Sequence, residues 1–318
     1  MYHIIINPAS RSGKGIKLWT QQIVPKLHNA KIPFRAYFSK QVGDVAQLVR
    51  EICETIKRES ETNATSPEDT VLIILGGDGT MNEALQGLDL TLPITLGYIP
   101  TGSSNDFARD LGIPKDPVAA LELILHGGKV TPMDVGTITY PNGEHRNFAV
   151  SFGIGYDAAV CAELLSSRFK ALCNKIGLGK LCYLGIALKQ LFATKAVDAT
   201  LTLDDNDPIP IGKMLFTTGM IHRYEGGGFM FCPNAVADDG LFDLCVAGDL
   251  PKLLILFALP TAFYGKHYMF KGISGYKAAK IKIETLVPLW VHTDGEVGHQ
   301  TTSLTITCKS KAMRVITP

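Results

Sequence analysis

A glycine turn that contains a carboxylate is the first place where this sequence could carry out chemistry. The apolar run LIIL at 72–75 leads into GGDGT at 76–80, with Asp78 among the glycines. Glycines let a ligand approach backbone N–H groups closely, and the start of a helix adds partial positive charge, so this turn suits a phosphate. The anionic Asp78 either caps the following helix, a role that Thr80 could also fill, or binds a cation that lies between it and the phosphate.

Two other polar turns follow apolar runs. The first, NPASRSGKG at 7–15, contains a Gly-Lys pair, but Gly15 follows it where a Walker A loop has Ser or Thr. The second, PTGSSNDFARDLGIP at 100–114, offers hydroxyl, amide and carboxyl groups that could bind a nucleotide or cap a helix. For each of these two turns taken alone, a purely structural role, as a strand-to-helix turn or a helix cap, explains the residues at least as well as binding of a phosphate or nucleotide. Three such turns at one edge of a sheet favour a nucleotide site.

Two acidic turns lie in the second half of the chain. In WVHTDGEVG at 290–298, Asp294 and Glu296 flank a glycine. They fit either a solvated turn between strands or a site that accepts a proton from an alcohol during phosphoryl transfer. The turn DDGLFD at 238–243 contains Asp-Gly, a strong hairpin signal. The histidines of this half are expected at the surface or in packing roles: His222, His267, His292 and His299.

Alternating strands and helices must position the three polar turns. Short apolar runs that suit parallel strands occur at 2–7, 34–39, 70–75 and 93–100, and helical patterns follow them at 17–30, 44–60, 80–88 and 117–127. Strand, loop and helix repeated with short links predict a doubly wound parallel sheet, which binds ligands at the carboxyl ends of its strands.

The pattern changes after residue 130. Short segments rich in β-branched and aromatic residues, separated by turn residues, predict an antiparallel β domain with helices near 158–193 and 251–265. We therefore expect an α/β N-terminal doubly wound, Rossmann-like domain and an all-β antiparallel sandwich-like C-terminal domain. The first spans 1–132 and can be completed by 308–318, and the second spans 133–307.

Composition excludes some classes of protein. Thirty-one basic and 30 acidic residues leave a net charge of +1 in 318 residues, so no global basic field for nucleic acid is present. Seven scattered cysteines favour reduced thiols in the cytoplasm, and the N-terminus shows no secretory pattern. The apolar run at 253–259 is far shorter than the roughly 20 residues of a transmembrane helix. The mean hydropathy of +0.14 is nevertheless high for a soluble enzyme.

One basic stretch could bring the protein to a membrane. Residues 164–197 contain no acidic residue, and their basic side chains lie among apolar ones: Arg168, Lys170, Lys175, Lys180, Lys189 and Lys195. This pattern suits docking to an anionic membrane surface, and a helix with a solvated basic face explains it equally well. The apolar segment 253–264 could likewise be core or line a cleft for acyl chains.

These motifs together resemble the bacterial diacylglycerol kinase family of soluble lipid kinases, which is related to sphingosine kinases and more distantly to NAD kinases. The resemblance rests on NPASRSGKG, GGDGTMNE, PTGSSNDFAR, GIGYDA, PNAVADDGLFD and HTDGE, which occur in the expected order from Ile6 to about Glu296. It implies an NAD kinase-like nucleotide-binding domain and a β-rich domain for the lipid.

The resemblance also implies roles for individual residues. ATP contacts would come from Asn7, Pro8, Ala9, Ser10, Arg11, Ser12, Gly13, Ser39, Gly76, Gly77, Asp78, Gly79, Thr80, Met81, Asn82 and Ser103. The family often has Thr where this chain has Ser39 and Ser103. A structural Mg²⁺ would be bound by Val236, Asp239 and Leu241, the first and last through main-chain oxygens. The family places its proton acceptor in the D-G-E turn, which makes Glu296 the expected base, with Asp294 as its partner or substitute.

The predicted activity is therefore Mg²⁺-dependent transfer of the γ-phosphoryl group of ATP to the hydroxyl of diacylglycerol or a related lipid. Asp78 would orient or indirectly hold the catalytic Mg²⁺. The lipid partner would be met at a membrane surface by a cytoplasmic protein without a transmembrane segment, and similar bacterial enzymes can form homodimers. An NAD kinase-like small-molecule kinase and a catalytically silent nucleotide- or lipid-binding module are the alternatives.

Overall fold

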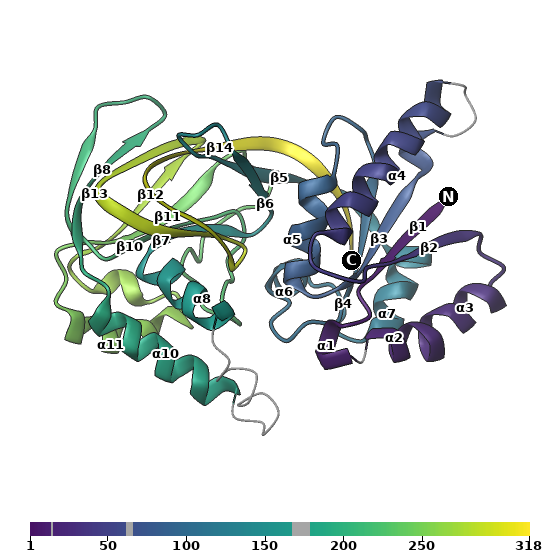
Figure 1. Ribbon diagram of the computed structural model, residues 1–318, viewed down its shortest axis with the longest axis horizontal. Coiled ribbons are helices and arrows are strands. Elements are labelled where there is room, and N and C mark those ends of the chain that lie inside the picture. Colours follow the sequence, from purple (N-terminus) through teal and green to yellow (C-terminus); the bar gives the residue numbers. More distant parts are fainter. Residues whose placement is uncertain (14, 62–65, 167–178) are drawn as a thin grey trace. The chain divides into compact units, whose positions relative to one another are not determined.

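The computed structural model describes residues 1–318 except 14, 62–65 and 167–178, and it separates into two compact units (Figure 1). Unit 1 comprises Met1–Val135, Ala237–Asp239 and Lys309–Pro318, and unit 2 comprises Gly136–Val236 and Gly240–Cys308. The first is an α/β unit and the second is built mainly from antiparallel strands. The predicted fold class is confirmed.

Unit 1 contains a parallel sheet with the strand order β2-β1-β3-β4-β14. The strands are β1 (Tyr2–Ile6), β2 (Phe34–Phe38), β3 (Val71–Gly76), β4 (Thr95–Pro100) and the end of β14 (Glu296–Thr317). The apolar runs predicted to be strands are buried: Ile4 to Ile6 and Leu72 to Leu75 are all fully inaccessible. A strand buried on both faces needs such a run because helices cover both sides of a doubly wound sheet.

Helices and single turns connect these strands. They are α1 (Ser10–Gly13), α2 (Gly15–Leu18), η1 (Trp19–Ile23), α3 (Val24–Asn29), α4 (Asp44–Glu61), η2 (Pro67–Asp69), α5 (Asp78–Gly87), α6 (Asp106–Asp110), α7 (Pro117–Glu122) and η3 (Leu123–Gly127). The predicted helix 17–30 is divided by the π-helical turn η1, just before Pro25, which lacks a backbone N–H. The longer α4 buries Val45, Val49 and Ile56 at helical spacing.

Unit 2 contains mostly antiparallel strands. They are the second part of β5 (Lys129–Thr139), β6 (His145–Phe148), β7 (Ser151–Gly155), β8 (Val197–Leu203), β9 (Ile209–Met214), β10 (Phe216–Met220), β11 (Phe242–Ala247), β12 (Ile273–Ala278), β13 (Lys280–Thr293) and the first part of β14. Its main strand order is β12-β11-β10-β7-β13-β14, and β8 pairs with β13 and β9. The sequence pattern predicts separate strands at 278–286 and 289–297. Most of both belongs to β13, which has register shifts around Pro288.

The helices of unit 2 are α8 (Tyr156–Ser166), α10 (Gly179–Ala193), α11 (Lys252–Ala262) and the single turn η4 (His267–Met269). In Figure 1, α8, α10 and α11 lie on one side of the strands of this unit. They contribute Val160, Ile186, Leu191 and Ile255 to one hydrophobic cluster. Across the described residues, no helix is both long and apolar enough to cross a membrane.

One contact in unit 1 leaves no room for a side chain. Gly87 ends α5 against the backbone of Ala46 in α4, and a Cβ atom on Gly87 would collide with the carbonyl oxygen of Ala46. The backbone of a helix cannot move aside as a flexible side chain can. Glycine therefore sets how closely α4 and α5 approach each other.

We expect Gly87→Ala to destabilise the protein by about 1–3 kcal/mol because the added methyl group must push two helices apart. Chemical denaturation monitored by circular dichroism measures this change. The matched control is Gly127→Ala, because a Cβ atom on Gly127 meets nothing within 4 Å. Equal stabilities of the two variants would show that the α4–α5 contact does not limit the fold.

Candidate active site

The carboxyl ends of four parallel strands place polar loops at one edge of unit 1. Asn7 follows β1, Ser39 follows β2, Gly77 follows β3 and Thr101 follows β4. Because every neighbouring pair of these strands is parallel, all four loops leave the sheet at the same edge. The chain reverses its direction of winding between β1 and β3, so this is the switch point at which such sheets bind ligands.

A hydrogen bond joins the loops on either side of this switch point. Asn7 donates from Nδ2 to Oγ1 of Thr80 at 2.9 Å and accepts the N–H of Ala9 on Oδ1 at 3.0 Å. The buried Thr80 side chain thus belongs to the interior of the loop cluster. Two of the predicted nucleotide loops, separated by about 70 residues of sequence, are held together by a single amide side chain.

The third loop lies against the other two. Thr101 donates a hydrogen bond to Ser10 Oγ at 3.0 Å, and its N–H donates to the Gly76 carbonyl at 2.8 Å. A Cβ atom on Gly77 would lie 3.1 Å from Cα of Gly102, and one on Gly102 would lie 2.8 Å from Cα of Gly77. Two loop backbones meet here with no side chain between them, an arrangement that requires glycine at both positions.

Helix α5 begins with the predicted carboxylate. Gly77 is its N-cap residue and has no side chain with which to cap the helix. Asp78 is the first helical residue. The alternatives in which Asp78 or Thr80 is the N-cap are therefore wrong, because both residues lie inside the first turn. Asp78 gains favourable interaction with the helix dipole at this position. Met81 and Asn82 have buried side chains, which leaves the backbone as their means of contacting a nucleotide.

Two carboxylates give this edge a negative potential. Burial, and then the charges of Asp78 and Asp106, raise the pKa of Tyr98 well above its usual value. Arg109 lies 3.6 Å from Asp106 and partly balances it. A polyphosphate bound at the start of α5 would meet the Asp78 carboxylate, so a divalent cation is needed between them. The donor set of this edge therefore fits a magnesium–nucleotide complex.

The remaining predicted contacts occupy the same edge. Ser39 donates its N–H to the Ile6 carbonyl at 3.0 Å and is nearly buried. Arg11 and Gly13 have positive φ angles of 54° and 84°, so the chain turns sharply within 8–13, which includes Pro8 and Ser12. Ser103 is exposed in the loop after β4, whose shape is fixed by Asn105 through hydrogen bonds to both the N–H and the carbonyl of Gly102.

In unit 2, the D-G-E turn is a two-residue hairpin. Asp294 and Gly295 have φ angles of 51° and 82°, and Thr293 pairs with Glu296 across β13 and β14. Positive φ at both central positions is typical of a type I′ turn, for which Asp-Gly is a preferred pair. Glu296 is half-buried and begins β14. The hairpin thus fixes the backbone on both sides of Glu296.

The two acidic residues of this turn have different surroundings. The carboxylate of Asp294 accepts three backbone N–H groups, those of Ala149 at 3.0 Å, Val150 at 2.8 Å and Ser151 at 3.0 Å. Charge-assisted bonds of this kind are short and strong, and they fix the orientation of the carboxylate. Asp294 therefore ties the hairpin to the β6–β7 connection, a positioning role that leaves Glu296 as the stronger candidate for proton transfer.

A buried ionic cluster supports the hairpin. His292 is fully buried and donates from Nε2 to Oδ2 of Asp157 at 2.8 Å, and Glu225 Oε1 lies 3.3 Å from the same nitrogen. On the other side of the ring, Gly295 donates its N–H to Nδ1 at 3.2 Å. The side chain of Thr218 donates to Glu225 at 3.2 Å. The cluster connects α8 to the turn that carries Glu296.

Opposing effects act on the imidazole. Burial lowers the pKa of His292, but the charges of Asp157 and Glu225 outweigh burial and raise it to about 9. The contact from Gly295 opposes this rise because only an Nδ1 atom without a proton can accept a hydrogen bond. We expect the raised pKa to hold, since two carboxylates outweigh one neutral N–H, and a proton on Nδ1 would loosen the Gly295 contact.

This predicts a pH dependence of stability. The folded pKa of about 9 exceeds the usual value of 6.5, so the contribution of His292 is complete below about pH 6.5 and is lost as the pH rises towards 9. Its upper limit is about 3 kcal/mol, and the Gly295 contact reduces it. Chemical denaturation at pH 6.5 and pH 9 should show a larger loss for the wild type than for His292→Gln. Equal losses would place the pKa of His292 near its ordinary value.

The predicted ligands of a structural Mg²⁺ lie in an irregular segment before β11. Val236 and Leu241 are counted in unit 2, whereas Asp239 is counted in unit 1 with the rest of Ala237–Asp239. Within unit 1, the Ala237 carbonyl accepts the N–H of Asp134 at 2.8 Å. These contacts fix the turn but do not test metal binding, so this site stays a prediction.

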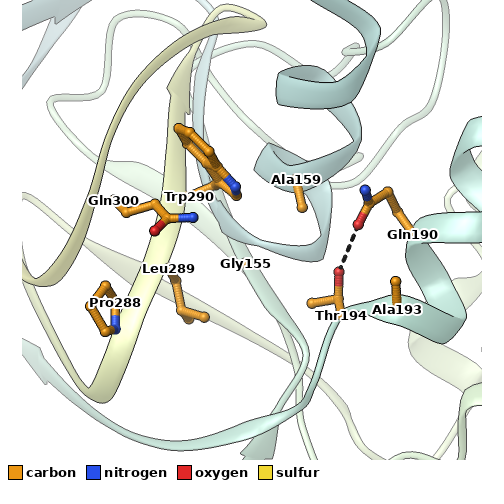
Figure 2. A pocket seen from close by; sticks show the side chains of 9 residues that line it. All are labelled: Gly155, Ala159, Gln190, Ala193, Thr194, Pro288, Leu289, Trp290 and Gln300. Atoms are coloured by element: carbon orange, nitrogen blue, oxygen red, sulfur yellow. Dashed lines mark hydrogen bonds between the residues drawn. The ribbon is translucent and has the colours of Figure 1, made fainter. Parts of the chain in front are cut away.

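A cavity of about 200 Å³ lies beside the hairpin formed by β13 and β14 (Figure 2). Trp290 and Leu289 of β13 line it on one side, and residues of α8 and α10 line the other. Its walls combine apolar side chains with amide and hydroxyl groups, and the complete lining is Gly155, Ala159, Gln190, Ala193, Thr194, Pro288, Leu289, Trp290 and Gln300. Such a cavity suits an apolar ligand that carries hydrogen-bonding groups.

Sequence reasoning missed the ionic cluster. The sequence predicts surface or packing positions for the four histidines: His222, His267 and His292 are buried and His299 is exposed, but the ionic role of His292 is not predicted. Asp157 and Glu225 come from α8 and from the loop after β10, and no periodic pattern relates them to His292. The only signal was the clustering of polar residues in HTDGE and GIGYDA.

Known proteins share both units of this chain. The diacylglycerol kinase catalytic domain matches residues 1–138, and the YegS C-terminal NAD kinase beta sandwich-like domain matches residues 150–317. A diacylglycerol kinase of Mycobacterium tuberculosis (strain ATCC 25618 / H37Rv) is 32% identical over 226 residues, which cover 71% of this chain and 70% of the relative. A diacylglycerol kinase of Bacillus subtilis (strain 168) is 26% identical, with 93% of this chain and 89% of the relative covered.

A solved structure shares the whole fold. The crystal structure of "a putative diacylglycerol kinase" from Bacillus anthracis str. Sterne is 27% identical, with a TM-score of 0.75, and the match covers 100% of this chain and 97% of that chain. An α/β unit that matches the diacylglycerol kinase catalytic domain, joined to a β sandwich-like unit, defines the class as a two-domain kinase. The chain belongs to the diacylglycerol kinase family of lipid kinases.

Proposed function

We propose that the protein is an ATP- and Mg²⁺-dependent lipid kinase. It transfers the γ-phosphoryl group of ATP to the hydroxyl of diacylglycerol or a related lipid and gives phosphatidic acid or its analogue. The reaction takes place in the cytoplasm, at the surface of the membrane that contains the lipid. The observation that supports this most strongly is the junction of three loops: Asn7 bonds to Thr80 at the β1/β3 switch point, and Gly77 meets Gly102 beside it, between β3 and β4.

Unit 1 supplies the nucleotide site. Backbone N–H groups at the start of α5, near Gly77 and Gly79, would bind the phosphates, because glycines let a ligand approach the backbone closely. The dipole of α5 favours negative charge at that place. Asn7 holds the loop after β1 in position through Thr80, so the remaining predicted contacts of that loop belong to the same site.

Asp78 is the residue assigned to Mg²⁺, held directly or through water. When bound, the ion neutralises the phosphate oxygens and the charge that develops on them during transfer. Asp78 compensates the charge of the cation, and its place in the first turn of α5 fixes its backbone. A second, structural Mg²⁺ at Val236, Asp239 and Leu241 is part of the proposal through family resemblance alone.

Unit 2 supplies the groups that act on the lipid. Glu296 accepts the proton of the attacking hydroxyl, and its backbone is held by the hairpin pair with Thr293. Asp294 and His292 position the turn through the β6–β7 connection and Gly295. The cavity beside Trp290 receives the part of the lipid next to its hydroxyl, where ester groups meet acyl chains.

We expect Glu296→Gln to lower the turnover number by about 10²–10⁴-fold because the amide cannot accept the proton. Radiolabelled ATP with mixed lipid vesicles measures phosphorylation, and thermal unfolding should be unchanged. Glu284→Gln is the matched control, since Glu284 is an exposed acid of β13 that pairs with Lys282. In contrast, Asp294→Ala should lower the melting temperature, because it leaves three N–H groups without their acceptor. Full activity of Glu296→Gln would remove this residue from the mechanism.

Asp78→Asn should lower activity and raise the Mg²⁺ concentration needed for half-maximal rate, each by about 10²-fold, because an amide binds the cation far more weakly. Initial rates over a range of Mg²⁺ concentrations measure both effects. Asp69→Asn makes the same charge change at the exposed, opposite end of β3 and should leave both values unaltered. If Asp78→Asn kept full turnover at limiting Mg²⁺, Asp78 would have no role with the ion.

A further inference from the structure

Helix α11 is apolar on the side that faces solvent as well as on the side that faces the core. Ile255, Ala258 and Ala262 are buried, whereas Leu253 and Phe257 are 63% and 68% exposed on the opposite side. A helix with apolar residues all round is normally enclosed by protein or lipid. Within the part of the chain that the structure describes, nothing covers these two side chains.

Helix α10 carries a second exposed apolar row. Leu184, Leu188 and Phe192 are spaced four residues apart and are 54%, 39% and 56% exposed. Lys252, the first residue of α11, donates to the carbonyl oxygens of Phe192 and Thr194, at 3.0 and 2.5 Å. The end of one helix is thus fixed to the start of the other.

The inner sides of both helices contribute to the same hydrophobic cluster as α8. Figure 1 shows α10 and α11 on the same side of unit 2. The exposed apolar residues therefore belong to a rigid surface and not to loose loops. We call the set of Leu184, Leu188, Phe192, Leu253 and Phe257 the apolar helix face; single exposed apolar residues are common, but a contiguous set marks a binding surface.

Basic residues outnumber acidic ones around this face, where Glu163 of α8 pairs with Lys189 of α10 and the exposed Asp249 precedes α11. Residues 251–283 contain no acidic residue, and neither does α10. Lys195, Lys266 and Lys271 are exposed near the ends of the two helices, and Tyr264, 75% exposed, follows α11. Basic and aromatic side chains beside an apolar surface are typical of proteins that rest in the interface of an anionic bilayer.

The geometry points to the apolar helix face as a surface that inserts into the interfacial region of the leaflet that the protein faces in an anionic bilayer. A second copy of this chain is a poorer occupant, because a symmetric contact would bring the lysines of one copy against those of the other. Anionic lipid head groups instead balance these lysines while the acyl chains receive Leu253 and Phe257. This inference rests on the proposed lipid kinase function and adds how the protein reaches a substrate that stays in the bilayer.

Vesicle flotation of the full-length protein tests the inference. We expect the double variant Leu253→Gln, Phe257→Gln to bind vesicles of phosphatidylglycerol and phosphatidylcholine at least tenfold more weakly than the wild type. The control is Leu286→Gln, which changes an 82% exposed leucine on β13. Both variants alter exposed side chains, so their melting temperatures should match the wild type. Wild-type binding should also fall when phosphatidylglycerol is omitted or salt is raised.

Insertion itself has a separate signal. Phe257→Trp should show a blue shift of fluorescence and quenching by brominated lipids when anionic vesicles are added. The native tryptophans give the background, because Trp19 is buried and Trp290 is 37% exposed in unit 2. If the emission of the Phe257→Trp variant, after subtraction of this background, stayed unchanged and the double variant bound vesicles normally, the inference would be overturned.

Two further outcomes separate the alternatives. If the wild type is a dimer in solution and the double variant is a monomer with unaltered vesicle binding, the face binds a second copy and the inference is wrong. Phosphorylation of a short-chain diacylglycerol in detergent micelles should be the same in both proteins, whereas phosphorylation of long-chain lipid in vesicles should fall in the variant. Absence of lipid phosphorylation in every assay would contradict the proposed function, and flotation would still decide whether the face binds membranes.

Discussion

Parallel pairing of β1, β3 and β4 is the constraint on which the rest of unit 1 depends. Parallel strands must all end at the same edge of a sheet, so loops that are far apart in the sequence are brought together there. The close approach of Gly77 and Gly102 requires glycine at both positions, and Asn7 then joins the two inner loops. The result is a glycine-rich edge beside the carboxylates of Asp78 and Asp106, and such an edge favours a polyphosphate only when a cation accompanies it.

A second constraint gives different roles to Asp294 and Glu296, whose carboxylates are two residues apart in the sequence. The type I′ turn gives Asp294 a positive φ angle and aims its carboxylate at three backbone N–H groups, whereas Glu296 is already in β14. Sequence spacing alone treats the two acids as equivalent, because each is an acid beside the same glycine. The hydrogen bonds distinguish them: three backbone N–H donors occupy the Asp294 carboxylate and fix the hairpin, so the role of Asp294 is to position the turn that carries Glu296.

The sequence was informative where structure is local and periodic. The apolar runs at 72–75 and 93–100 predicted buried parallel strands, and parallel strands in turn predicted that their following loops meet. The sequence alone did not show whether His292 is exposed or buried, because its partners Asp157 and Glu225 come from other elements. The strand β12 was missed for a similar reason: ISGYKA is short and half-exposed, and its pairing with β11 is what defines it. Non-local pairing leaves little trace in a single sequence.

The high mean hydropathy of the chain acquires a physical meaning from the helices of unit 2. A buried strand such as β3 adds apolar residues without cost to solubility, but α11 places Leu253 and Phe257 in contact with solvent. A protein that exposes such a set of apolar side chains loses solubility, so the presence of the set indicates a binding function that offsets this loss. The insertion into a membrane that we propose for this face would supply that function: α11 is too short to span a bilayer, yet the face is apolar enough to keep a lipid kinase reversibly adsorbed beside a substrate that stays in the membrane.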